Sequence, residues 1–151
     1  MMQKTLMSAA LLLALFSSCQ QAGKPSEKDS VTTTAAPVDS VDLLSKEVMD
    51  IHDEGMAKMM TIRRLKAQLD TAIMVQKKAG KPVTVFTEQQ ASLEVANSAM
   101  NNWMHVYDMD LEGKDAAQKK AYLLSERTKI TAVRDTMLNA IDAATKVLQN
   151  K

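Results

Sequence analysis

The sequence has very little of the residue types on which small enzymes and metalloproteins depend. Its 151 residues include one cysteine, two histidines and only 3% aromatic side chains. A single cysteine excludes a disulfide framework and a zinc site built from several thiolates. Lysine and arginine number 19 against 18 for aspartate and glutamate, so the chain lacks the basic balance that a general hold on nucleic acid needs. The length fits one domain.

The sequence also lacks the residue combinations of the common catalytic sites. A serine or cysteine nucleophile needs a positioned base and an orienting acid. His52 and Asp53 are adjacent, so on a helix their side chains diverge by about 100° and do not form such a relay. The Glu-x-x-His motif of di-iron bundles is absent. We therefore expect a protein that is not an enzyme, with no cofactor and no small-molecule substrate.

What the sequence does contain is a leader typical of bacterial export. Lys4 precedes an apolar run from Leu6 to Phe16, which is too short to cross about 30 Å of hydrocarbon but has the length of a signal peptide core. The segment Phe16-Ser17-Ser18-Cys19 resembles the lipobox of bacterial lipoproteins, with Phe where Leu is usual. The resemblance implies that residues 1–18 are removed and that Cys19 carries a diacylglycerol and an acyl chain. An ordinary cleaved signal with a chance cysteine is the alternative.

The residues that follow Cys19 predict a tether. From 19 to 38 the chain is rich in Gln, Ser, Thr and Pro and has almost no large apolar side chain. Such a segment cannot bury enough surface to offset the entropy of ordering, so we expect it to be disordered. It lacks an acidic run directly after the cysteine, of the kind linked with surface display. We expect a cell-envelope lipoprotein that faces the periplasm, in the outer membrane rather than the inner one.

The remaining residues, 39–151, have the periodicity of amphipathic helices. Apolar residues recur at steps of three, four and seven, which predicts helices over about 41–79, 88–108 and 116–149. Gly80 and Pro82 predict the end of the first helix, and Thr87 with Gln90 predicts a capping box for the second. We expect an all-α fold: an elongated antiparallel three-helix bundle, with the first helix on the second and the second on the third.

The predicted helices differ in length, at roughly 58, 34 and 51 Å. A short middle helix cannot cover two long neighbours, and uncovered apolar strips usually mark contact surfaces. Apolar residues at the two ends therefore form a predicted interaction surface: Val41, Leu44, Val48, Ile141 and Leu148. Two alternatives stay open at Gly55. Either the first helix breaks there and its start folds back, or the glycine lets another backbone approach closely.

A copper site is a second hypothesis. His52, Met56 and Met59 share one helix face, and an antiparallel neighbour that turns near 80–86 would bring Met56 to Arg63 opposite Trp103 to Asp110, close to Met104 and His105. Thioether and imidazole groups suit Cu(I). Methionine also fills gaps in a core that has few aromatics, and His105 is predicted to point away from the apolar stripe.

A chaperone is a third hypothesis. The segment Phe86-Thr87-Glu88-Gln89-Gln90 is similar to the Leu-Thr-x-x-Gln motif of small periplasmic chaperones of the Spy type, with Phe for Leu and in one copy. The capping box explains the same residues. Trp103, Tyr107 and Tyr122 are expected to cluster where the second and third helices meet, as anchoring aromatics of the core or as one end of a ligand groove.

Taken as a whole, the chain resembles a group of small helical lipoproteins from Bacteroidota that often carry the label "viral A-type inclusion protein". The resemblance is carried by the lipobox at Cys19, by residues 52–56, by residues 99–107 and by Tyr122-Leu123. It implies a helical fold and an envelope location but no activity. The function we expect is that of a lipid-anchored scaffold or interaction module. Its partners would be the membrane, through the anchor, and other envelope proteins or a second copy.

Overall fold

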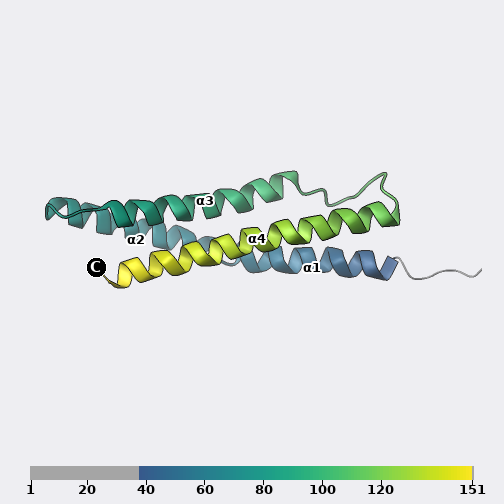
Figure 1. Cartoon of the computed structure of the whole chain (residues 1–151), viewed down its shortest axis with the longest axis horizontal. Helices are drawn as coiled ribbons and strands as arrows, with labels where there is room; N and C mark the ends of the chain where they lie inside the picture. Colours follow the sequence, from purple (N-terminus) through teal and green to yellow (C-terminus); the bar gives the residue numbers. More distant parts are fainter. Residues whose placement is uncertain (1–37, 151) are drawn as a thin grey trace, which may run out of the picture. The chain divides into compact units, whose positions relative to one another are not determined.

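The computed structural model describes residues 38–150, with side chains from Ser40 onward. Within this range the regular structure is helical: α1 Val38–Met56, α2 Met59–Lys78, α3 Thr84–Val106 and α4 Ala116–Gln149. α1 and α2 follow one another along one arm of a three-helix bundle, and α3 and α4 form the other two arms (Figure 1). The prediction of an all-helical three-helix bundle is therefore confirmed. The predicted signal peptide, the tether and Cys19 lie outside the described residues. No helix among residues 38–150 is long and apolar enough to cross a membrane.

A seven-residue spacing of buried side chains runs through all three arms. On α4 the fully buried residues at this spacing are Leu123, Ile130, Met137 and Ala144. On α3 the buried residues at this spacing are Phe86, which is 5% exposed, Leu93 and Met100, and on the first arm they are Val48, Gly55, Ile62 and Leu69. This spacing keeps one face of each helix toward its neighbours over many turns, as in coiled coils. The core is accordingly aliphatic and methionine-rich.

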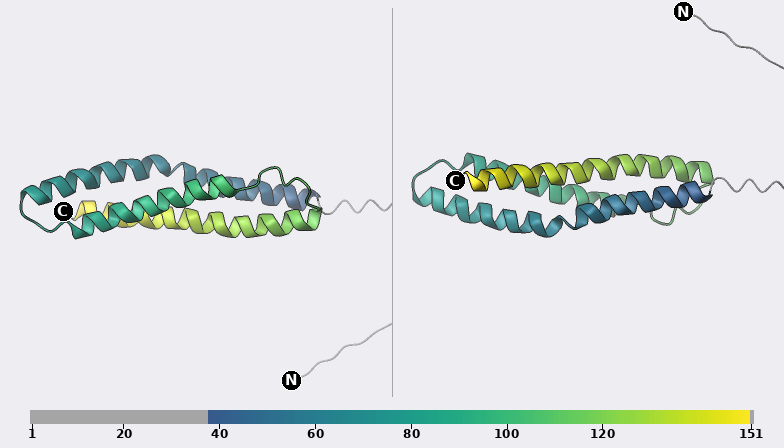
Figure 2. Two further views of the ribbon diagram at one scale, coloured as in Figure 1. Left: turned by 90° about the horizontal axis from the view of Figure 1, so that it is seen from above. Right: turned by 90° about the horizontal axis from the view of Figure 1, so that it is seen from below.

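The chain passes along the bundle three times. α1 and α2 run in one direction, α3 returns, and α4 runs in the same direction as α1 and α2 (Figures 1 and 2). The contact predicted between the first and second helices occurs between α2 and α3. The contact predicted between the second and third helices occurs between α3 and α4. The structure adds an extensive parallel contact of α1 with α4, because α4 is long enough to reach both halves of the first arm.

The helix predicted over 41–79 is broken into α1 and α2, a possibility that the sequence left open at Gly55. The N–H of Lys58 donates to the carbonyl oxygen of Gly55 at 2.9 Å, which is a tighter turn than an α-helix makes, and α2 begins only at Met59. Figure 2 shows that α2 continues along the bundle beyond α1, so the start of the arm does not fold back. Lys58 stands seven residues from both Ile51 and Leu65. At this spacing a buried apolar residue would hold the helix against its neighbours, and lysine cannot do so. The break falls at the weakest point of the apolar stripe.

Gly55 explains why the arm is weak there. It is buried, and the terminal methyl of Met100 from α3 occupies the space of a Cβ, while Met137 Sδ from α4 lies 3.6 Å from that position. Of the two alternatives left open at Gly55, the break occurs but without the fold-back, and the close approach of another backbone is wrong. The helix breaks just after the glycine, and the close approach is made by side chains rather than by another backbone.

The start of α3 also differs from the prediction. The helix begins at Thr84, three residues before Thr87, and the Thr87 hydroxyl donates to the Thr84 carbonyl at 2.8 Å inside the helix. The capping box predicted at Thr87 is therefore wrong. A capping box does occur at α4, where Asp115 and Gln118 exchange side-chain and backbone bonds. α4 has the bounds predicted for it.

The segment between α3 and α4 makes up for the shortness of α3. Leu111 lies in this segment and is only 6% exposed, with a left-handed φ of 52°. The Tyr107 hydroxyl forms a hydrogen bond with Ser45 of α1, and the N–H of Asp108 donates to the Tyr122 hydroxyl of α4 at 2.7 Å. This irregular segment thus covers α1 and the start of α4 where the α3 helix has ended.

The predicted interaction surface is wrong for Val48 and changed for its other members. Val48 is completely buried, because α4 and the segment after α3 cover α1. The partly buried remainder packs against the core: Val41, Leu44, Ile141 and Leu148. These four residues therefore make contacts within the chain but keep part of their surface exposed, and Leu148 is one of them.

We predict that Gly55→Ala lowers the free energy of unfolding by about 1 kcal/mol, because crowding of a packed core costs about 1–3 kcal/mol and the gain in helix propensity returns about 1 kcal/mol. In a Met100→Leu background, which lacks the crowding methyl, the same substitution should be neutral or stabilising. Urea denaturation followed by circular dichroism measures both. Equal losses in the two backgrounds would contradict this role of Met100.

Candidate functional site

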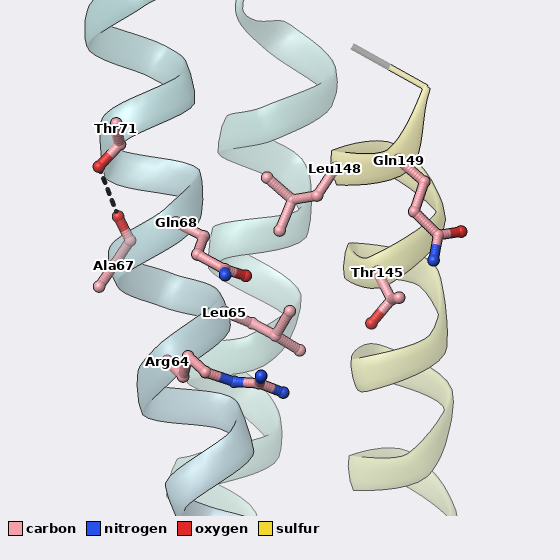
Figure 3. A pocket seen from close by; sticks show the side chains of 8 residues that line it. All are labelled: Arg64, Leu65, Ala67, Gln68, Thr71, Thr145, Leu148 and Gln149. Atoms are coloured by element: carbon pink, nitrogen blue, oxygen red, sulfur yellow. Dashed lines mark hydrogen bonds between the residues drawn. The ribbon is translucent and has the colours of Figure 1, made fainter.

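An open groove separates α2 from α4 near the C-terminal end of α4 (Figure 3). Its volume is about 610 Å³. The lining side chains come from α2 and α4 alone and are Arg64, Leu65, Ala67, Gln68, Thr71, Thr145, Leu148 and Gln149. Leu65 is 4% exposed and Leu148 packs against the core, so the bottom of the groove is apolar.

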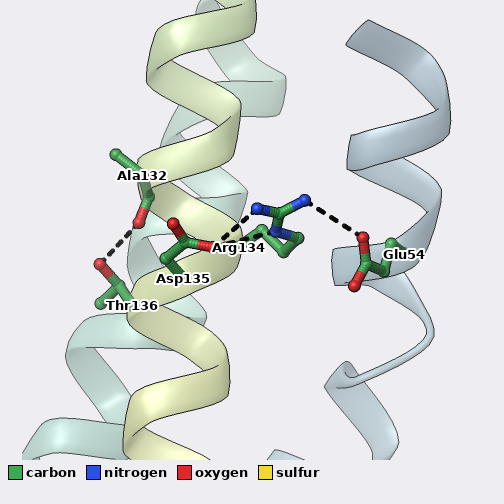
Figure 4. A network of polar contacts seen from close by, with 5 residues as sticks. All are labelled: Glu54, Ala132, Arg134, Asp135 and Thr136. Carbon is green, nitrogen blue, oxygen red and sulfur yellow. Dashed lines mark hydrogen bonds and ion pairs between the residues drawn. The ribbon is translucent and has the colours of Figure 1, made fainter. Parts of the chain in front are cut away.

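The first arm and α4 meet along a line of contact, here called the seam. The groove lies in the half of the seam between α2 and α4, and ion pairs close the half between α1 and α4. Between α1 and α4, Glu47 pairs with Arg127 at 3.0 Å, and seven residues further on each helix Glu54 pairs with Arg134 at 3.3 Å (Figure 4). Arg134 also binds Asp135 at 2.8 Å, and these hydrogen bonds raise the pKa of its guanidinium. Charged pairs at the edges of a parallel helix pair hold it in register.

Beyond the α1–α2 break this row of ion pairs ends. One step of seven residues leads from Glu54 and Arg134 to Thr61 and Ile141, and the next leads to Gln68 and Leu148. Neither position can form an ion pair, and Gln68 and Leu148 both line the groove. The seam is thus open where its sequence no longer supplies opposite charges.

The groove has hydrogen-bonding groups but no acid, base or nucleophile. The Thr71 hydroxyl donates to the Ala67 carbonyl at 3.1 Å and the Thr145 hydroxyl to the Ile141 carbonyl at 2.7 Å, so both are used within their own helices. The amides of Gln68 and Gln149 and the guanidinium of Arg64 remain. Arg64 forms no ion pair within residues 38–150 and gives the groove a positive charge.

A second hollow of about 230 Å³ adjoins the groove along α2 and shares Thr71 with it. Its other lining residues are Ala72, Val75 and Gln76. Val75 is 58% exposed and its neighbour Met74 is 59% exposed. Apolar surface therefore extends from the groove toward the end of α2.

Aromatic side chains form a separate cluster between α1, α3 and α4. Trp103 stacks on Tyr107 with ring centres 4.5 Å apart, and Tyr107 lies 6.1 Å from Tyr122. The predicted clustering of these three residues is confirmed. His52 of α1 adds a fourth ring, 5.6 Å from Trp103. Burial raises the pKa of Tyr107, against the opposing effect of its hydrogen bond with Ser45.

Glu126 is the buried charged residue of this cluster, with 3% exposure. One carboxylate oxygen accepts from Trp103 Nε1 at 2.9 Å and the other accepts from Lys129 Nζ at 2.6 Å. The carboxylate raises the pKa of Lys129 through this hydrogen bond. Since each oxygen of the carboxylate has a partner, the cluster is a structural joint between α3 and α4.

Asp108 organises the segment next to the cluster. Its carboxylate accepts from the Leu111 N–H at 3.1 Å and from Lys114 Nζ at 2.6 Å. The hydrogen bond with Lys114 lowers the pKa of Asp108. Lys114 also lies 5.5 Å from the centre of the Tyr122 ring. These contacts keep Leu111 in its buried, left-handed conformation.

The structure places the residues of the copper hypothesis in different surroundings. His52 has a side chain that is 14% exposed, and Met59 is buried in the core. His52 Nδ1 lies 2.9 Å from Asp53 Oδ1, so the expectation that these adjacent side chains diverge is wrong. The exposed members are Met56, Met104 and His105. Within residues 38–150 no group of three or more His, Cys, Asp or Glu side chains could hold a metal ion.

The predicted register between the first arm and α3 is wrong. Trp103 lies against His52 and Met100 against Gly55, rather than opposite the segment from Met56 to Arg63. The turn after α2 is shorter than expected because α3 begins at Thr84, and the break after Met56 shifts the pairing further. The register on which the copper hypothesis depended is therefore absent.

Sequence reasoning missed the groove residues Arg64, Gln68 and Gln149. The signal in the sequence was that, at steps of seven residues, the acidic Glu47 and Glu54 are followed by the uncharged Thr61 and Gln68. That signal has meaning only once α1 and α4 are known to run parallel.

Comparison with known proteins assigns no family: no family model, curated protein or solved structure matches the chain. Function must therefore be inferred from the residues and their geometry.

We predict that Glu126→Leu destabilises the fold by about 1–3 kcal/mol, because it leaves the Trp103 N–H buried without an acceptor. In a Trp103→Phe background no buried N–H is left without an acceptor, so Glu126→Leu should destabilise the fold less or even stabilise it. Denaturant unfolding of the four chains, followed by circular dichroism, gives the coupling. Additive losses would contradict a joint held by this hydrogen bond.

Proposed function

We propose that this protein is a non-enzymatic lipoprotein of the bacterial cell envelope, which acts by binding another protein in the α2–α4 groove. The observation that carries the proposal is the open seam itself. A three-helix bundle with an apolar gap between two of its helices has room for a further helix, and helices commonly bind proteins in this way. The absence of an acid, base or nucleophile from the groove lining fits binding rather than catalysis.

The leader supports an envelope location. The only cysteine of the chain directly follows the short apolar run and the two serines at positions 17 and 18. Two or more acyl chains on Cys19 would anchor the protein stably. A polar tether over 20–37 could span up to about 60 Å, so the bundle could reach partners away from the membrane that holds it. We place the anchor in the outer membrane, with the bundle in the periplasm.

The lining of the groove indicates the chemistry of the partner. Leu65 and Leu148 offer an apolar floor, and Gln68 and Gln149 offer amide groups at the rim. Arg64 adds a positive charge that no acid within residues 38–150 neutralises. The occupant that fits is an amphipathic helix with apolar side chains flanked by carboxylates.

The copper and chaperone hypotheses stay predictions without support from a particular contact. Phe86 of the Spy-like segment is 5% exposed in the core, and Gln90 donates to Asp70 of α2. These two residues therefore have roles in holding α3 to its neighbours.

We predict that radiolabelled palmitate is incorporated into the full chain in growing cells and that Cys19→Ala abolishes the label. The wild-type chain should fractionate with membranes and the variant should not be processed at residue 19. A wild-type chain that carries no label would contradict the proposed anchor.

We predict that a photo-crosslinking amino acid at Gln149, on the rim of the groove, gives a discrete protein adduct in intact cells. The matched control is the same amino acid at Thr128, which is exposed on α4 outside the groove. Leu148→Glu should weaken the adduct several-fold, because it puts a charge in the apolar floor. Adducts of equal strength from both positions, or none from Gln149, would count against the groove.

A further inference from the structure

We propose that the occupant of the α2–α4 groove is α1 of a second copy of this chain, in an antiparallel dimer whose two-fold axis passes close to the α1–α2 break. The inference rests on the proposed function, because it names the partner that the groove binds. Each copy would cover the groove of the other, so one isologous contact would close both grooves.

Acidic and basic residues are separated along the first arm. α1 contains six acidic residues and one base, Lys46, whereas α2 contains five bases and one acid, Asp70. An antiparallel pair of arms places the acidic helix of each copy on the basic helix of the other. A parallel pair would place acid on acid and base on base, which costs free energy. Charge complementarity therefore selects the antiparallel arrangement.

The spacing of two residues on α1 also matches the spacing of two residues in the groove. Leu43 and Asp50 are seven residues apart on α1, and Arg64 and Thr71 of the groove are seven residues apart on α2. In an antiparallel pair centred on Ala57, Leu43 faces Thr71 and Asp50 faces Arg64. The centre of this pairing falls within the break between the two helices.

The outward face of α1 exposes a large apolar side chain to solvent. Leu43 is 68% exposed although it is a large aliphatic residue, and it stands on the same side of α1 as Asp50. The pairing with Thr71 brings Leu43 to the groove, whose lining includes Leu148, and burial there removes its apolar surface from water. The outward face of α1 thus combines an apolar side chain and a carboxylate, which is the chemistry that the groove fits.

The acids that face outward are available for a partner. Glu47 and Glu54 are held by α4, but Asp50 has 62% of its side chain exposed, and its one ion pair among the described side chains is with Lys46 at 2.6 Å. An exposed pair one helical turn apart contributes little, so Asp50 can exchange Lys46 for Arg64 of the second copy.

The decisive experiment is disulfide formation in the full chain carrying Leu43→Cys and Thr71→Cys, expressed in its native envelope. Within one copy these positions lie about 40 Å apart along the arm, far beyond the 7 Å or so that a disulfide can bridge, so any bond between them joins two copies. We expect a dimer band on a non-reducing gel. The matched control pairs Leu43→Cys with Thr128→Cys, outside the groove, and should stay monomeric. The wild-type chain, whose only cysteine is Cys19, gives the background.

Charge exchange tests the pairing itself. In the chain with both cysteines, Asp50→Arg or Arg64→Asp alone should lower the dimer yield about threefold or more, and the two together should restore it. Failure of the double exchange to restore the dimer, or an equal yield from the Thr128 control, would overturn the proposal. A Gln149 photo-adduct with a different protein would overturn the second copy as partner but leave the proposed function intact. Absence of both dimer and adduct would overturn both.

Discussion

The bundle depends on one stripe of α4 that is buried against every other helix. Leu123, Ile130, Met137 and Ala144 repeat every seven residues and have no exposed surface. Because α4 spans 34 residues, this stripe can serve α1 and α2 in succession on one side and α3 on the other. The first arm can therefore be interrupted without loss of the fold, since each of its halves is held separately by the same helix.

Departures from the apolar repeat give the molecule its particular features. Gly55 admits Met100, and Lys58 stands seven residues from both Ile51 and Leu65 in place of an apolar residue, so the first arm breaks between Met56 and Met59. Glu126 occupies a core position on α4, at seven residues from Val133, and its carboxylate binds Trp103 of α3. At Gly55 and at Glu126, apolar burial is exchanged for a contact with α3, made by Met100 and by Trp103 respectively. The buried polar atoms of the described side chains all have partners, so this exchange leaves none stranded.

The distribution of charge then separates a closed seam from an open one. Two glutamates of α1 meet two arginines of α4 and close the first half of the seam, whereas the corresponding positions of α2 are the uncharged Thr61 and Gln68. The cations of α2 are left without partners on α4, and Arg64 faces the groove. A protein with almost no net charge can thus carry one acidic and one basic helix on the same arm, which is the property on which the proposed docking of a second copy rests.

The sequence by itself determined the helical class, three arms, the bounds of α4 and the end of α2. Spacing of apolar residues and the pair Gly80 and Pro82 are local signals, and local signals decide where helices form. The tertiary structure decided the rest. The break after Gly55 depends on the Met100 side chain from another helix, and the burial of Val48 depends on the parallel contact of α1 with α4. The groove exists because Gln68 and Leu148 meet across two helices far apart in the chain, and no spacing within one helix reveals such a pair.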